Sequence, residues 1–392
     1  MAQSGSPPPF LTTEISSEMK KKQEEEEEEE EEQAAASIPE GPLVEILSRV
    51  PYRSLCRFKC VSKPWLALCS DPDIRKRCPQ TLSGFFQLRT HGMDGVRFSN
   101  LSGRGPPMVD ASLPFLRKSY EVVNFGHCCG GLVLCTCPKA DPREFEDEAD
   151  LVVCNPATEK WTKLPPCPIE EWFRLLSESH QYLGFDPAVP SRFVVFLDLL
   201  DEVAIYSSDT GRWTVVRSGW IIEPRTMGYL ESVFLNGTMH LLTSESSILR
   251  VDTEGKVCRN IDIPGNARQS FVDPSPSIGQ SQGCLYAWYV DNPNTCQLFV
   301  WALEDYGSAN WTLKHTVNIL ELFGRQRRKH DESYKMFAVH PDRNLIFLTD
   351  GKKKAISYDM DNREVHVIGI CRKLWGVQPY IPCFADWPSD GH

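Results

Sequence analysis

The densest group of residues with possible metal or redox chemistry lies in HCCGGLVLCTC, residues 127–137. Its candidate ligands are His127, Cys128, Cys129, Cys135 and Cys137. Thiolates and imidazoles at zinc-ribbon spacing bind Zn²⁺, but no CxxC pair recurs here. The Val/Leu/Cys run instead indicates a strand, because cysteine is a good small core residue. We therefore expect a structural role, with Gly130 and Gly131 in a hairpin or at a close backbone approach.

The remaining motifs that could carry catalysis are weaker. SSDTGRW, residues 207–213, nearly matches the Asp-box turn of sialidases but is one residue short before Trp213. The nucleophilic tyrosine and arginine cluster of a sialidase have no signature, and Asp209 and Gly211 suit a tight hairpin by themselves. A glycine-rich phosphate loop, HExxH and GxSxG are missing from the sequence. We expect no catalytic residue, no metal and no cofactor, so the chain is not predicted to be an enzyme.

The charge distribution argues against nucleic-acid binding. Nine consecutive Glu at 24–32 account for most of the net charge of −11 and leave −2 for the rest of the chain. A chain without basic excess lacks the main driving force for binding a phosphate backbone. Residues 1–37 are of low complexity and cannot bury apolar surface. We expect them to form a disordered acidic tail, which is solvated or contacts something basic.

Cysteine usage and hydropathy predict the compartment. The chain has 15 cysteines, an odd number, and MAQSGSPPPF shows no secretory signal. No apolar run approaches the roughly 20 residues of a membrane span. We expect free thiols in the cytoplasm, the nucleus or both, and no membrane contact.

Residues 38–80 carry a helical pattern. Apolar residues recur at helical spacing before Pro51, namely Leu43, Val44, Ile46, Leu47 and Val50. Ser54 and Ser62 are candidate caps of two further helices, the last with Pro64 in its first turn. Three helices of two to three turns are marginal alone, and their apolar residues spread over more than one face. An exposed apolar surface that binds another protein is therefore expected.

From Leu82 onward the pattern becomes all-β. Short apolar runs alternate with turns rich in Asn, Asp, Gly and Pro. A strand, a turn and a second strand recur at 152–165, 203–216, 248–264, 298–314 and 355–368. The interval of roughly 50 residues is that of kelch-type propeller blades, so residues 83–392 would hold about six. The first and last blades are degenerate and can share strands that close the ring. Aromatic residues after the turns are expected between blades, namely Trp161, Trp213 and Trp311.

Two resemblances to known families agree with these patterns. IPEGPLVEILSRVPYRSLCRFKCVSKPWLALCSDPDI, residues 38–74, resembles the F-box, departing only at Ile38 and Gly41-Pro42. Residues 127–370 resemble the F-box-associated propeller of plant F-box proteins. The shared landmarks, in order, are HCCGGLVLC, VVCNPATEKWTKLP, YLGFDP, VAIYSSDTGRW, VFLNGTMHLL and ILRVDTEGKV. The domains expected are a tail at 1–37, an F-box of three helices at 38–80 and a propeller at 83–392.

The resemblance implies a substrate receptor of an SCF-type ubiquitin ligase. The F-box would bind a Skp-family adaptor and, through it, a cullin, while the propeller presents an unknown protein substrate. Such a receptor does no bond chemistry and acts through proximity. The positions carried over, for adaptor contact or for the F-box core, are Pro39, Leu43, Ile46, Leu47, Pro51, Leu55, Val61 and Trp65. A cullin-independent propeller scaffold and a propeller enzyme are the alternatives.

Two segments between strands are candidates for substrate contact. The first is a long insert, and long loops on a propeller rim carry recognition more often than strands do. PIEEWFRLLSES, residues 168–179, contributes Trp172 and Phe173. The alternative interpretation is a short helix packed on the rim. GRQRRKH, residues 324–330, is the only dense basic stretch between strands. It is a nuclear signal, a contact for an acidic substrate through Arg325, Arg327 and Arg328, or a solvated loop.

Overall fold

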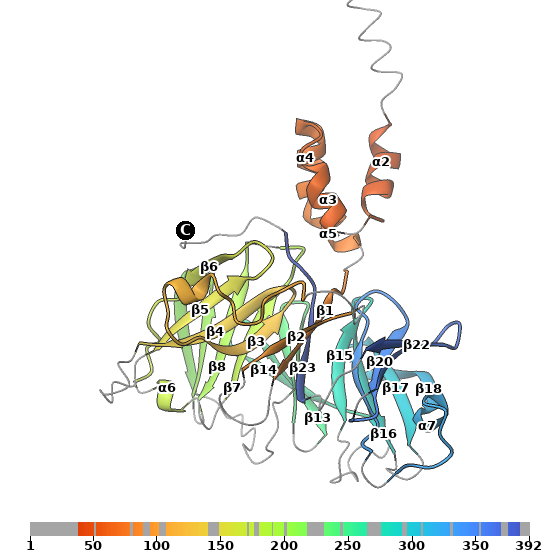
Figure 1. Cartoon of the computed structure of the whole chain (residues 1–392). Helices are drawn as coiled ribbons and strands as arrows, with labels where there is room; N and C mark the ends of the chain where they lie inside the picture. The colour runs from red at the N-terminus through yellow and green to blue at the C-terminus, as the bar shows by residue number, and fades with distance from the viewer. Residues whose placement is uncertain are drawn as a thin grey trace, which may run out of the picture.

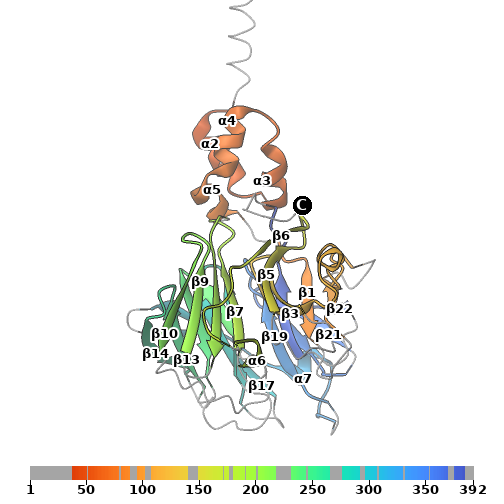
Figure 2. The same ribbon diagram turned by 90° about the vertical axis from the view of Figure 1, so that its left-hand side faces the viewer.

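A computed structural model shows a small helical domain standing on one end of a ring of antiparallel sheets (Figures 1 and 2). The predicted tail, residues 1–37, and Pro51 lie outside the residues that the structure describes. The described residues are 38–50, 52–78, 81–88, 95–101, 107–139, 149–170, 172–175, 180–189, 191–199, 202–217, 231–243, 246–264, 276–291, 296–306, 309–329, 332–352, 354–369 and 375–384.

The helical domain consists of short helices with polar caps. They are α2 (Glu40–Leu47), α3 (Tyr52–Phe58), α4 (Lys63–Ser70) and α5 (Pro72–Arg77). The predicted cap of α4 is confirmed, since Ser62 Oγ accepts a hydrogen bond from the Trp65 N–H at 3.4 Å. Ser54 is not a cap, because α3 begins two residues before it.

The helix α5 adds to the three helices that the sequence predicts. Asp71 caps it by accepting hydrogen bonds from the N–H groups of Asp73 and Ile74, at 2.8 and 3.2 Å. Pro72 occupies the first helical position, where a missing N–H costs nothing. Aspartate followed by proline is therefore the local signal for this helix.

The sheets form a six-bladed β-propeller, and five of its blades have four strands in sequence order from hub to rim. The first comprises β3 (Asn124–Cys129), β4 (Leu132–Pro138), β5 (Ala149–Asn155) and β6 (Lys160–Lys163). The second comprises β7 (His180–Phe185), β8 (Phe193–Leu199), β9 (Glu202–Ser207) and β10 (Arg212–Arg217). The third comprises β11 (Ser232–Leu235), β12 (Thr238–Leu242), β13 (Ser247–Asp252) and β14 (Val257–Asp262).

Two more blades complete this series. The fourth comprises β15 (Ser277–Ser281), β16 (Cys284–Val290), β17 (Gln297–Asp305) and β18 (Asn310–Asn318). The fifth comprises β19 (Lys335–Val339), β20 (Leu345–Thr349), β21 (Ala355–Asp359) and β22 (Glu364–Gly369). The innermost strands β3, β7, β11, β15 and β19 contact one another in succession, and β23 (Trp375–Tyr380) joins β19 to β3.

The sixth blade closes the ring with strands from both ends of the β region, as predicted. Its order is β2 (Arg97–Asn100), β1 (Gly84–Leu88) and β23, and Gly84 pairs with Tyr380. The Tyr380 ring is fully buried and lies edge-on to Phe86 and Phe98, at centroid distances of 5.3 and 5.6 Å. The packing of these three aromatic side chains joins the first and last strands of the propeller.

The five repeats seen in the sequence are the outer hairpins of the five four-stranded blades. The tryptophans that follow their turns are partly buried between blades, as expected. They also form a repeated link to the preceding blade. Trp213 Nε1–H donates to the Pro165 carbonyl at 2.8 Å, and Trp311 Nε1–H donates to the Asp262 carbonyl at 3.0 Å.

The helical domain and the propeller share one hydrophobic cluster. It includes Leu47, Leu55 and Cys78 from the helical domain, and Leu134 and Leu183 from the first two blades. Both views show α5 as the helix nearest the sheets (Figures 1 and 2). The end of the helical domain opposite α5 therefore points away from the propeller.

Candidate functional site

The eight positions carried over from the F-box pattern fall into different environments. Leu43, Leu47 and Leu55 are 7%, 0% and 0% exposed and build the core of the helical domain. Trp65 is partly buried, with its ring edge-on to Phe58 at 5.7 Å. These four residues hold the helices together.

Other positions of the pattern point into solvent. Pro39 is exposed, and Ile46 and Val61 are 50% and 60% exposed. Ile38, where the sequence departs from the F-box pattern, and Leu66, which was not among the eight positions, are 49% and 47% exposed. We call Ile38, Ile46, Val61 and Leu66 the exposed apolar residues of the helical domain. Aliphatic side chains this exposed are accessible to a partner protein, and a contiguous patch of them would mark a binding surface.

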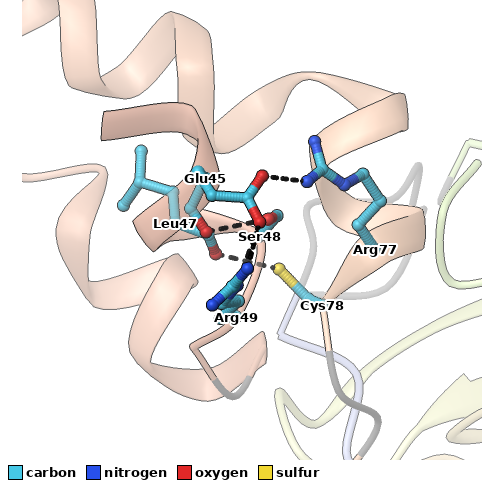
Figure 3. Close-up of polar contacts among 6 residues, drawn as sticks. All are labelled: Glu45, Leu47, Ser48, Arg49, Arg77 and Cys78. Atoms are coloured by element: carbon cyan, nitrogen blue, oxygen red, sulfur yellow. Dashed lines mark hydrogen bonds and ion pairs between the residues drawn. The ribbon is translucent and has the colours of Figure 1, made fainter. Parts of the chain in front are cut away.

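An ion-pair cluster fixes α5 against α2, as Figure 3 shows. The Glu45 carboxylate accepts hydrogen bonds from Arg49, with Nη2 at 2.6 Å, and from Arg77 of α5. These two guanidinium groups lower the pKa of Glu45, Arg77 having the larger effect. Cys78 Sγ donates to the Leu47 carbonyl at 3.3 Å (Figure 3). These contacts join α5 to α2, the helix that carries Ile46.

The first candidate substrate segment is a single helical turn. Trp172 and Phe173 begin α6 (Trp172–Leu175), and their rings lie edge-on at 6.0 Å. Both are partly buried, and Trp172 packs against the cluster shared with the helical domain. This agrees with the alternative interpretation of a short helix packed on the rim, and both side chains keep some exposure.

The second candidate segment follows α7 (Ile319–Leu322), in the connection from β18 to β19. Glu332 contacts two of its arginines: Arg328 Nε donates to the Glu332 carbonyl at 2.7 Å, and Arg325 Nη2 lies 3.8 Å from Glu332 Oε1. Arg327 is exposed.

The two candidate segments lie at the same end of the propeller but do not meet. Figures 1 and 2 place α6 and α7 at the end of the propeller away from the helical domain. In Figure 1 they lie on opposite sides of the propeller. They are therefore two separate candidate contacts.

Titratable groups at the propeller hub link neighbouring blades. His127 Nδ1 accepts a hydrogen bond from the Leu183 N–H at 3.1 Å, so its Nε2–H donates to Ser232 Oγ at 2.8 Å. Burial lowers the pKa of His127 to about 4, which keeps it neutral. The Glu231 carboxylate accepts from the Ile278 N–H at 2.9 Å. The hub encloses a channel of about 1260 Å³ that Arg75 and Arg77 of α5 also line. His127 and Glu231 thus accept hydrogen bonds from backbone N–H groups on the innermost strands of neighbouring blades, which is a structural role.

The cysteine-rich segment is part of the first blade. Cys128, Cys135 and Cys137 are buried in β3 and β4, as the structural interpretation predicts. Within the described part of the chain no group of three or more His, Cys, Asp or Glu side chains is placed to hold a metal ion. Gly130 and Gly131 have positive φ angles of 53° and 94°, and a Cβ on Gly131 would lie 2.2 Å from the Ile381 carbonyl oxygen. The hairpin and the close approach are therefore both present.

Comparison with known proteins assigns both the helical domain and the propeller to known families. Residues 36–77 match the F-box domain, and residues 110–380 match the β-propeller described as "F-box protein At3g26010-like". F-box protein At5g07610 of Arabidopsis thaliana is 26% identical over 71% of this chain and 69% of its own length. F-box protein At3g26010 of the same plant is 25% identical, over 83% and 77%. The putative F-box/kelch-repeat protein At4g22430 is 25% identical, over 79% and 74%. Among the described helices, none is long and apolar enough to cross a membrane.

Proposed function

The chain belongs to the F-box proteins with an At3g26010-like β-propeller, and we propose that it is the substrate-recognition subunit of an SCF-type ubiquitin ligase. An F-box domain implies binding to a Skp-family adaptor. One observation carries the proposal: Ile46 and Val61 are at least half exposed on a helical domain whose core is filled by Leu43, Leu47 and Leu55. The adaptor would cover these exposed side chains and hold the receptor on a cullin.

The arrangement of the two domains supports substrate presentation by the propeller. The F-box occupies one end of the ring, and the connections that carry α6 and α7 lie at the other (Figure 1). A substrate bound there would leave the adaptor contact free. The receptor would then act by holding a substrate lysine near a charged ubiquitin-conjugating enzyme, so that effective molarity accelerates transfer. We place this activity in the cytoplasm or nucleus, because the cysteines whose side chains are described are free thiols.

Co-purification of the tagged full-length chain from plant extract tests the proposal. The wild-type chain is expected to capture both adaptor and cullin. Ile46→Asp/Val61→Asp should lose both by more than tenfold, because apolar anchors at an interface centre each contribute over ~2 kcal/mol. Val215→Asp/Val257→Asp, at residues 41% and 42% exposed on rim strands, is the matched control and should retain them.

The outcomes separate the alternatives. A wild-type chain that never captures cullin contradicts the ligase proposal, and adaptor without cullin favours the scaffold. Leu47→Ala tests the fold instead, since removing this fully buried side chain costs about 2–5 kcal/mol of unfolding free energy.

A further inference from the structure

The F-box and the chain that leads into it carry opposite charge. Residues 38–78 contain eight Lys or Arg and four Asp or Glu, a net charge of +4, and nine consecutive Glu precede them at 24–32. We propose that this Glu tract docks on the basic surface at the α3–α4 turn and competes there with the adaptor. Competition with the adaptor rests on the proposed function, whereas docking of the tract does not.

Two of the four F-box carboxylates are engaged, while one group of cations makes no ion pair among the described residues. Glu45 is shared between Arg49 and Arg77, and Asp71 caps α5. By contrast, Arg57, Lys59 and Lys63 make no ion pair with any residue that the structure describes. They fall within seven residues of one helix–turn–helix, so their charges add at one place.

This basic surface surrounds part of the exposed apolar surface. Val61 lies in the turn between Lys59 and Lys63, and Leu66 follows in α4; the two apolar side chains are 60% and 47% exposed. An acidic segment bound to the two lysines would therefore cover Val61. Covering Val61 removes one of the residues assigned above to adaptor contact.

The Glu tract is tethered close enough to reach this surface. The chain enters α2 at the end of the F-box away from the propeller, and α4 lies at that end too (Figures 1 and 2). Glu32 is six residues before Ile38, a reach of up to about 20 Å for extended chain. This reach is about twice the 10–12 Å diameter of a helix with its side chains, so the tract can extend across the neighbouring helices toward the α3–α4 turn.

Tethering makes even a weak contact effective. A short flexible tether gives an effective concentration on the order of 1 mM. If the free peptide binds with a Kd of about 0.2 mM, the tethered tract lowers adaptor affinity about sixfold. Because the contact is electrostatic and exposed, it should weaken strongly between low salt and about 0.5 M salt.

A peptide titration without adaptor tests the docking directly. The probe is a fluorescent peptide of residues 23–37, and the receptor is the full-length chain with each Glu from Glu24 to Glu32 changed to Gln. Fluorescence anisotropy at low salt is expected to give a Kd below about 1 mM. Adding Lys59→Glu/Lys63→Glu should weaken the peptide at least fivefold. The matched control Lys118→Glu/Lys256→Glu, at exposed propeller lysines, should leave it unchanged.

Adaptor binding then tests the competition. The chain with the neutral tract is expected to bind adaptor several-fold more tightly than wild type at low salt, and equally at about 0.5 M salt. Equal peptide binding to the Lys59→Glu/Lys63→Glu and control variants, or a Kd above about 1 mM, would overturn the docking. Peptide binding with no adaptor capture by any variant would instead reject the proposed function and leave the docking intact.

Discussion

At the residue scale, a buried histidine between blades makes stability depend on pH. His240 of β12 is 1% exposed, and its Nδ1–H donates to the Val233 carbonyl at 3.2 Å. Its Nε2 finds no hydrogen-bond partner among the described residues, and its ring lies 5.8 Å from that of Tyr306. Burial lowers the pKa of His240 to about 4. The folded chain therefore keeps this ring neutral where an unfolded chain would bind a proton.

This predicts a pH dependence with a definite sign. An unfolded histidine has a pKa of about 6.5, so the contribution of His240 is fully present above that pH and is lost as the pH falls toward 4. Between pH 7.5 and 5 the wild-type chain should lose up to about 2 kcal/mol more unfolding free energy than His240→Phe. Urea unfolding followed by tryptophan fluorescence at the two pH values measures this. His366→Phe, at an exposed position, is the control, and equal losses in wild type and His240→Phe would contradict the prediction.

The sequence identified the F-box positions but could not divide them into core and surface. Ile46 and Leu47 are neighbours in α2, yet one is 50% exposed and the other fully buried. Two-turn helices are too short for periodicity to define a face. The core around Leu47 is also completed by Cys78 and by propeller side chains, which are distant in sequence.

At the element scale, closure of the ring depends on the sixth blade. The Tyr380 side chain is fully buried against Phe86 and Phe98, but its hydroxyl has no hydrogen-bond partner in the described part of the chain. Tyr380→Ala should cost about 3–5 kcal/mol of unfolding free energy, because the cavity opens between the first and last strands. Tyr380→Phe keeps the ring and removes an unpaired polar group, so it should be neutral or stabilising. Thermal unfolding of both variants checks this, and equal losses would show that the ring packing does not hold the closure.

The outer hairpins could be predicted because their turns carry their own chemistry. Asn155 Oδ1 accepts from the Ala157 N–H at 3.0 Å, Asp252 Oδ1 from the Glu254 N–H at 3.0 Å, and Asp359 Oδ1 from the Asp361 N–H at 2.9 Å. An Asn or Asp side chain closes each of these three turns, so these residue types recur in the repeats. The inner hairpins do not share one device: Asp186 Oδ1 accepts from the Ala188 N–H at 2.9 Å between β7 and β8, whereas Gly130-Gly131 makes the turn between β3 and β4. The pairing of β1 with β23 is set by packing across the whole domain rather than by any local motif.

At the scale of the whole molecule, adaptor and substrate contacts are expected at opposite ends. Trp172→Ala/Phe173→Ala should change which proteins are recovered by proximity labelling under proteasome inhibition, because α6 lies at the end away from the F-box. Adaptor capture should stay at the wild-type level. Arg325→Ala/Arg327→Ala/Arg328→Ala is the parallel test at the other candidate segment. Labelling profiles identical to wild type in both variants would remove both segments as substrate contacts.

The closing blade also orders events during translation. Residues 38–78 leave the ribosome first, whereas β23 is made almost 300 residues later and the ring cannot close without it. At about 5–20 residues per second, this interval lasts roughly 15–60 s. The propeller side chains that share the F-box core come mainly from the first two blades, up to Tyr206, so most of that core can pack well before β23 is made. A nascent chain with two blades formed would therefore expose the aliphatic side chains of α2 and α4 before its ring of blades is closed.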